Sequence, residues 1–112
     1  MPRVSVLMSV YNSERDLAEA IESILGQTFA DFEFILVDDG STDRSGEILH
    51  SYRDERIVLL RNESNIGLTR SLNRGLQLTR GEYIVRLDAD DVALPERLER
   101  QVEYLDLHPE VG

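Results

Sequence analysis

Two residue types are absent from this chain, and each absence excludes classes of chemistry. The sequence contains no cysteine, which rules out disulfide bonds, thiolate metal sites and cysteine nucleophiles. It also contains no lysine, because all 12 basic residues are arginine. Without lysine the chain can form neither a P-loop nor a Schiff base, and it lacks the lysine expected in a phosphorylatable receiver domain.

Long apolar runs and excess positive charge are missing as well. No apolar stretch approaches the roughly 20 residues of a membrane-spanning helix, and the N-terminus shows no signal-peptide pattern. We therefore expect a cytoplasmic protein, with peripheral association with a membrane left open. The 22 acidic and 12 basic residues give a net charge of −10, which argues against a nucleic-acid partner. A diphosphate ligand would require a bound cation to reverse the local field.

The pattern of apolar residues predicts an α/β protein. With 112 residues, of which 41% are hydrophobic, the chain is expected to form a single globular domain over residues 1–112. Four β-prone segments alternate with helical patterns: residues 4–10, 32–37, 57–60 and 83–87. Repeated strand–helix–strand units form parallel sheets with right-handed crossovers. We expect a Rossmann-like parallel sheet flanked by helices, with its strands in the order 3-2-1-4.

Two of the helical patterns make specific predictions about packing. Leu68, Leu72 and Leu76 stand four residues apart, so we expect this stripe to face the core. Pro95 suits the first turn of a helix, where its missing N–H group needs no partner. The last helix should therefore begin at this proline. Its predicted apolar stripe consists of Leu94, Leu98, Val102 and Leu105.

Polar residues follow three of the four predicted strands. Residues 11–12 come after the first strand, residues 38–39 after the second, and the acidic segment 88–91 after the fourth. The carboxyl ends of parallel strands meet at one edge of a sheet, and ligands bind there at the point where the strand order reverses. Carboxylate oxygens are the ligands that Mg²⁺ and Mn²⁺ prefer. We therefore predict a Mg²⁺ or Mn²⁺ site that includes residues 88–91.

A set of short motifs carries a resemblance to a known family. The motifs are Val4–Asn12, Val37–Asp43, Asn65-Ile66-Gly67, Gly81–Ile84 and Asp88-Ala89-Asp90-Asp91. In this order and spacing they resemble the nucleotide-sugar-binding half of family 2 glycosyltransferases, which are inverting enzymes with the GT-A fold. The resemblance covers nearly the whole chain. It implies a domain that binds a nucleoside-diphosphate sugar with a divalent metal, for transfer to the hydroxyl of a sugar, polysaccharide or lipid-linked acceptor.

The resemblance also implies roles for the acidic residues and for Tyr11. Asp90 would ligate the cation that bridges the two phosphates, and Asp88 would lie near the ribose and the water shell of the metal. Asp39 would accept the imino N–H of the base, and Tyr11 would stack on that base. UDP is the favoured nucleotide because an ionised Asp39 is acceptor-only, although dTDP and GDP also offer an imino donor.

Four further residues belong to the expected nucleotide-sugar site. Ser9 and Val10 would line the base pocket, partly through their backbone groups. Ala89 lies between the two acids of the Asp-x-Asp motif and is placed in the same site. Arg70, in the third helical pattern, would reach the base or the diphosphate. Together with the acids and Tyr11, these residues complete the site that the resemblance implies.

Several of these residues have a structural interpretation that the sequence leaves open. Asp38 or Asp39 could cap the helix after Gly40, and Asp38 is as well suited to this role as to ligand binding. Thr42 and Asp43 are expected to be caps. Tyr11 could pack in the core or at its rim. Asp91 could neighbour the metal site or the next helix without ligating the ion.

The resemblance predicts an incomplete enzyme and leaves rival functions open. The general base is expected beyond Gly112, so we expect a donor-binding fragment, truncated at its C-terminus, with little or no transfer activity alone. An uncovered helix face or strand edge would favour self-association. A non-catalytic scaffold on the same fold is the main alternative. A nucleotidyltransferase is less consistent, because its basic Gly-rich loop and lysines are missing, and dinucleotide binding lacks its Gly-x-Gly-x-x-Gly.

Overall fold

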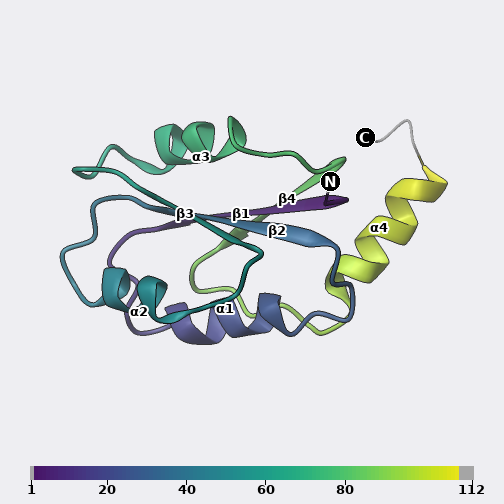
Figure 1. Ribbon diagram of the computed structural model, residues 1–112, viewed down its shortest axis with the longest axis horizontal. Helices are drawn as coiled ribbons and strands as arrows, with labels where there is room; N and C mark the ends of the chain where they lie inside the picture. Colours follow the sequence, from purple (N-terminus) through teal and green to yellow (C-terminus); the bar gives the residue numbers. More distant parts are fainter. Residues whose placement is uncertain (1, 109–112) are drawn as a thin grey trace.

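A computed structural model describes residues 2–108, which form a four-stranded sheet between two helical layers (Figure 1). All strand pairs are parallel, and the strand order is β3-β2-β1-β4. The strands are β1 (Val4–Val10), β2 (Phe32–Asp38), β3 (Ile57–Arg61) and β4 (Tyr83–Asp88). The predicted fold class, a Rossmann-like α/β sheet with order 3-2-1-4, is therefore confirmed. The predicted strands end within one residue of the observed ones.

The helices cover both faces of the sheet and one of its ends. On one face lie α1 (Leu17–Leu25) and α2 (Ser45–Ser51), and α3 (Leu68–Leu76) lies on the other (Figure 1). The last helix, α4 (Arg97–Leu107), lies beyond the end of the sheet at which β1 begins. Within residues 2–108, no helix has the length and apolarity needed to cross a membrane.

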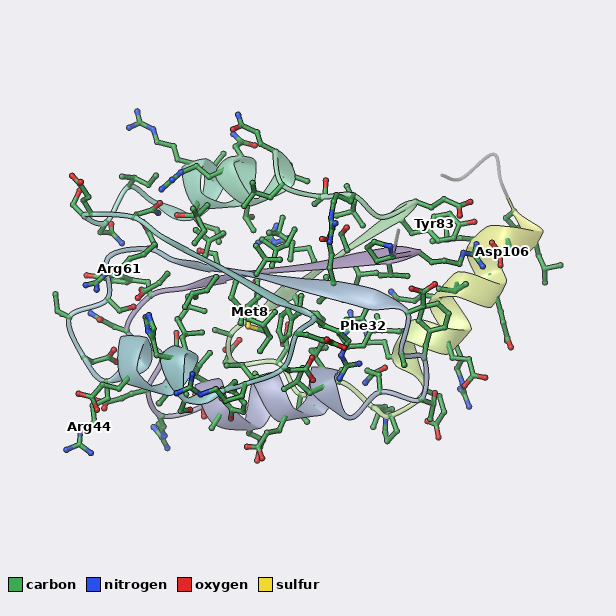
Figure 2. All side chains as sticks on the ribbon, in the orientation of Figure 1. Met8, Phe32, Arg44, Arg61, Tyr83 and Asp106 are labelled. Carbon is green, nitrogen blue, oxygen red and sulfur yellow. The ribbon has the colours of Figure 1, made fainter. Side chains whose placement is uncertain are left out.

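Alternating side chains of the two central strands build a separate core on each face. Val6, Met8 and Phe34 are fully buried in the main core, which includes α1 (Figure 2). On the opposite face a smaller cluster of Leu7, Ile35 and Val37 packs against α3. Because β1 and β2 are buried on both faces, their sequences read as nearly continuous apolar runs.

The face of α3 that packs against the sheet differs from the leucine face that the sequence predicts. The buried residues of α3 are Ser71 and Gly75. Leu68 and Leu76 are 50% and 41% exposed, and only Leu72 packs against the smaller cluster. A Cβ atom added at Gly75 would overlap Leu7, so the helix lies too close to β1 for larger side chains. The predicted core stripe is therefore wrong at both of its ends.

The last helix begins at Arg97, two residues after Pro95. Of its predicted apolar stripe, Leu98 and Val102 enter the main core, whereas Leu94 is 74% exposed. Its C-terminal half is held by Asp106, a residue labelled beside the start of β4 in Figure 2. The Asp106 carboxylate accepts hydrogen bonds from the Tyr83 hydroxyl at 2.6 Å and from the Arg3 guanidinium at 2.7 Å. These contacts fix α4 at the amino ends of the strands and leave the carboxyl ends open.

Candidate functional site

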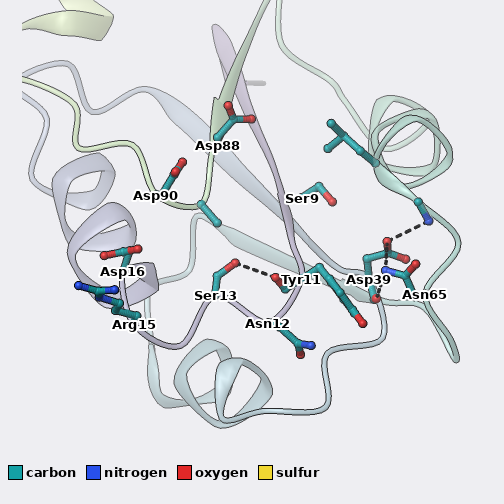
Figure 3. A pocket seen from close by; sticks show the side chains of 13 residues that line it. Ser9, Tyr11, Asn12, Ser13, Arg15, Asp16, Asp39, Asn65, Asp88 and Asp90 are labelled. Carbon is teal, nitrogen blue, oxygen red and sulfur yellow. Dashed lines mark hydrogen bonds between the residues drawn. The ribbon is translucent and has the colours of Figure 1, made fainter.

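A cavity of about 540 Å³ opens at the carboxyl ends of β1 and β4 (Figure 3). The strand order reverses between these two strands, which is where open α/β sheets bind ligands. The volume of this cavity lies within the range of about 300–1,000 Å³ that is typical of ligand sites. The lining includes six of the eight predicted site residues: Ser9, Tyr11, Asp39, Asp88, Ala89 and Asp90.

The other two predicted residues lie outside the described lining. Val10 is fully buried in the main core, but its carbonyl oxygen accepts a hydrogen bond of 2.8 Å from the Asp39 backbone N–H. Val10 therefore positions Asp39 through its backbone. Arg70 is an exposed residue of α3. A direct ligand contact remains a prediction for both residues.

One side of the cavity carries the acidic segment that follows β4. Asp88, Asp90 and Asp91 each present a carboxylate oxygen, and these oxygens lie within 4.8 Å of one another. All three residues are exposed. Three convergent hard oxygen donors fit Mg²⁺ or Mn²⁺, which keep several positions for water and phosphate. Asp91 also accepts a 3.1 Å hydrogen bond from the Asp88 backbone N–H, so it stabilises the turn that presents the cluster.

Asp39 forms the opposite side of the cavity, where Figure 3 shows it beside Asn65. It is only 2% exposed, and its carboxylate accepts four hydrogen bonds. Oδ1 receives the Asn62 side-chain amide at 2.9 Å and the Ile66 N–H at 2.8 Å. Oδ2 receives the Asn65 side-chain amide and the Gly67 N–H, both at 3.0 Å.

These contacts determine the charge of Asp39. Burial raises the pKa of its carboxyl group, but the hydrogen bonds from Ile66, Asn62 and Gly67 outweigh burial and lower the pKa below its usual value. The group is therefore an ionised, acceptor-only carboxylate at neutral pH. Asn62 also donates to the Ser71 hydroxyl at 2.9 Å, which connects Asp39 to α3.

Tyr11 is 47% exposed and lines the cavity, so it does not pack in the core. The next residue, Asn12, has a φ of 45° and locks two loops together. Its side-chain oxygen accepts hydrogen bonds from the Thr42 and Asp43 backbone N–H groups at 2.8 and 3.3 Å. Asn12 therefore holds the loop after β1 against the loop after β2, beside the exposed ring of Tyr11.

Two acids near the cavity, Asp38 and Asp43, have structural roles. Asp38 is 2% exposed, and its Oδ1 accepts a 3.0 Å hydrogen bond from the Ser41 N–H within the turn after β2. Asp43 accepts a 2.9 Å hydrogen bond from the Ser45 N–H at the first residue of α2. Its other oxygen accepts the Glu14 N–H at 3.2 Å. Asp38 thus stabilises a turn and does not cap α2. Asp43 binds the first residue of α2, but the N-cap position itself is Arg44, which makes no side-chain cap hydrogen bond.

The lining contains residues to which the sequence assigned no role. Arg15 and Asp16 come from the loop after β1, and Asn65 precedes α3 (Figure 3). Arg15 is the one basic residue among the described lining residues. Its place in the loop that directly follows β1, at the carboxyl edge of the sheet, is a signal that could have identified it. The role of Asn65 has no such local signal, because its partner Asp39 lies 26 positions away.

Residues 5–112 match the model of the family described as Glycosyl transferase family 2, and the chain belongs to this family. Its four-stranded sheet is the nucleotide-binding half of the GT-A fold that the motifs implied. The sequence is 48% identical over 110 residues to the putative glycosyltransferase EpsE of Bacillus subtilis, covering 96% of this chain and 40% of that protein.

Two solved structures with this fold contain bound ligands. TarS of S. aureus in complex with UDP-GlcNAc has a TM-score of 0.89 and 32% identity, over 96% of this chain and 32% of that one. The mannosyltransferase PcManGT from Pyrobaculum calidifontis, in complex with GDP-Man and Mn²⁺, has a TM-score of 0.85 and 27% identity, over 93% and 32%. The present chain therefore spans less than half the length of each of these relatives.

Proposed function

We propose that this chain binds a nucleoside-diphosphate sugar together with a divalent cation, as the donor-binding part of an inverting glycosyltransferase. One observation carries the proposal. A single cavity at the carboxyl ends of β1 and β4 joins Tyr11 and Asp39 to the carboxylates of Asp88 and Asp90. It thus combines a surface suited to a base with a cluster suited to a metal-bound diphosphate.

The base would lie at the Tyr11 side of the cavity. An exposed aromatic ring provides a stacking surface for a nucleobase, worth about 1–3 kcal/mol in nucleic-acid complexes. The ionised carboxylate of Asp39 selects a ring that offers an N–H donor. This chemistry favours the imino group of uracil, and hence a UDP-sugar, while thymine and guanine carry a similar donor. The UDP-GlcNAc complex of TarS supports this preference.

The diphosphate would lie at the acidic side, where a cation is required. Asp16, Asp39, Asp88 and Asp90 all line the cavity, so an anionic ligand without a metal would meet strong repulsion. We propose that Asp90 and Asp88 hold Mg²⁺ or Mn²⁺, which when bound offsets charge on the departing nucleoside diphosphate. The Mn²⁺ in PcManGT supports this assignment. Arg15 supplies a further positive charge for a phosphate oxygen.

The transfer step belongs to our proposal for the whole protein. In an inverting reaction an acceptor hydroxyl attacks the anomeric carbon opposite the nucleotide, and a carboxylate base removes its proton. The bond from the anomeric carbon to the diphosphate oxygen breaks as the new glycosidic bond forms. The task of the present chain is to bind the donor, orient its base and diphosphate, and hold the leaving group.

Calorimetric titration with UDP, with and without Mn²⁺, tests the donor site. We expect binding that requires Mn²⁺ and is weakened about 10-fold or more by Asp90→Asn. Asp31→Asn is the matched control, because Asp31 is exposed and precedes β2 at the opposite end of the sheet. Equal binding by the Asp90→Asn variant would contradict the assignment of the metal site. Absence of UDP binding under all conditions would favour a non-catalytic scaffold on the same fold.

A further inference from the structure

The acceptor positions of Asp39 are fully occupied in the free protein. An ionised carboxylate offers about four lone-pair sites, and Asp39 receives two hydrogen bonds on each oxygen. All four donors belong to the segment between β3 and α3. If Asp39 is to accept an N–H from a nucleobase, one of these four donors must therefore leave.

Three of the four donors are held in place. The N–H groups of Ile66 and Gly67 are backbone donors, and Gly67 directly precedes α3. Asn62 is only 2% exposed and is fixed by the Ser71 hydroxyl and by Arg74. Displacing any of these groups would disturb the start of α3 or leave a buried amide without a partner, which is costly.

The fourth donor, the side-chain amide of Asn65, is the least restrained, because its one other hydrogen bond within residues 2–108 is a long one of 3.5 Å to the Asp39 backbone oxygen. Asn65 is exposed, lines the cavity and points to Asp39 in Figure 3. Because this side chain is exposed, the Asn65 amide can turn away from Asp39 into solvent by side-chain rotation alone.

We propose that the Asn65 side chain occupies the base-recognition position on Asp39 in the free protein and is displaced when a base donates its imino N–H. The inference rests on the proposed nucleotide function and deepens it. Asn65 keeps the buried carboxylate hydrogen-bonded while the cavity is empty, which avoids the cost of an unpaired acceptor. By returning to Asp39 it also assists release of the nucleotide.

If a base N–H replaces the Asn65 amide on Asp39, removal of this amide should change the affinity for UDP. In the unchanged chain, UDP gains a hydrogen bond to Asp39 but breaks the one from Asn65. In Asn65→Ala there is no such bond to break, so UDP should bind about three- to tenfold more tightly. CDP provides a ligand control, because the N3 atom of cytosine carries a lone pair in place of the imino N–H, and the gain in affinity should be smaller for CDP than for UDP.

Calorimetric titration in the presence of Mn²⁺ tests this inference. Asn73→Ala is the matched variant, because Asn73 is an exposed asparagine of α3 outside the described lining of the cavity. We expect tighter UDP binding for Asn65→Ala only. UDP binding by this variant that is unchanged or weaker would overturn the displacement of Asn65 and leave the donor site intact. Failure of the unchanged chain to bind UDP would instead overturn the proposed function.

An NMR measurement on the unchanged chain keeps the test independent of the folding of the variant. The Asn65 side-chain amide signals should shift on addition of UDP and Mg²⁺. The backbone amides of Ile66 and Gly67 should keep their protection from hydrogen exchange, because their bonds to Asp39 persist. An unperturbed Asn65 amide, with UDP bound, would contradict the exchange.

Discussion

Glu33 is a buried carboxylate in the second strand, with an exposed fraction of 3%. Its Oε2 accepts hydrogen bonds from the Ser5 hydroxyl at 2.5 Å and from the Arg80 backbone N–H at 2.7 Å. The Arg80 guanidinium contacts Oε1 at 3.1 Å. Burial raises the pKa of Glu33, but the hydrogen bonds from Ser5 and Arg80 outweigh burial and lower the pKa below its usual value.

This lowered pKa predicts how stability depends on pH. A group whose pKa is lower in the folded state stabilises the protein above its unfolded pKa and loses that contribution as pH falls through the folded pKa. The usual value for a glutamate is 4.5. We therefore expect the free energy of unfolding from urea titrations to be nearly constant between about pH 6 and 8 and to fall below about pH 4.5.

The Glu33→Gln variant separates this residue from the other acids. We expect it to lose about 1–3 kcal/mol of stability at neutral pH, because a hydrogen-bonded charge is removed, and to lose less on acidification. Glu103→Gln, at an exposed position of α4, should behave like the unchanged chain. An equally steep acid loss in Glu33→Gln would contradict the role of Glu33.

Part of the site is predictable residue by residue, and part is not. Tyr11, Asp39 and Asp90 follow strands, so the carboxyl edge of a parallel sheet brings them to one cavity. The donors to Asp39 come from residues 23 to 28 positions away, and no local spacing reports them. They become visible only when the loop before α3 is placed in space.

At the scale of elements, the strands are more predictable than the faces of the helices. The two central strands are buried on both sides, so an apolar run identifies each of them without any choice of face. For α3, the face that packs against the sheet must be inferred from the sequence, and the spacing of its leucines indicates the wrong face. Ser71 and Gly75 face the sheet because their small size lets the helix approach β1 closely.

Gly75→Ala tests this close approach. A Cβ atom at residue 75 would overlap Leu7 and lie 3.2 Å from Val37 Cγ2. Overpacking a core typically costs about 1–3 kcal/mol, while alanine gains up to about 1 kcal/mol of helix propensity over glycine. We expect a net loss of up to about 2 kcal/mol in the free energy of unfolding, measured by thermal or urea denaturation.

Asn73→Ala controls for helix propensity, because Asn73 is an exposed position of the same helix. This control should retain or gain stability. A Gly75→Ala variant as stable as the control would show that α3 can move away from β1 without cost, which would contradict the packing described for this helix.

For the whole molecule, the edge beside β4 is an open strand edge with exposed apolar residues. In the described part of the chain β4 pairs only with β1, and Ile84 at this edge is 48% exposed. Leu76 of the neighbouring helix is 41% exposed and lines the same surface cavity as Ile84. An open strand edge with apolar neighbours favours association with another chain.

We therefore expect the 112-residue chain to self-associate as its concentration rises, with sedimentation velocity as the measurement. Ile84→Lys should shift the equilibrium to the monomer, because a charge at an edge opposes strand pairing. Ser51→Lys adds the same charge at the exposed end of α2 and should have little effect. A monomer at all concentrations would contradict this expectation.

The proposed function requires a nucleotide and a divalent cation to share the cavity between β1 and β4. Backbone NMR of the chain with UDP, first with Mg²⁺ and then with Mn²⁺, locates both ligands. We predict that UDP shifts the signals of residues 9–12 and 65–67, and that paramagnetic Mn²⁺ broadens those of residues 88–91. Perturbations gathered instead in the groove between β4 and α4, around Arg86 and Gln101, would contradict the proposed function.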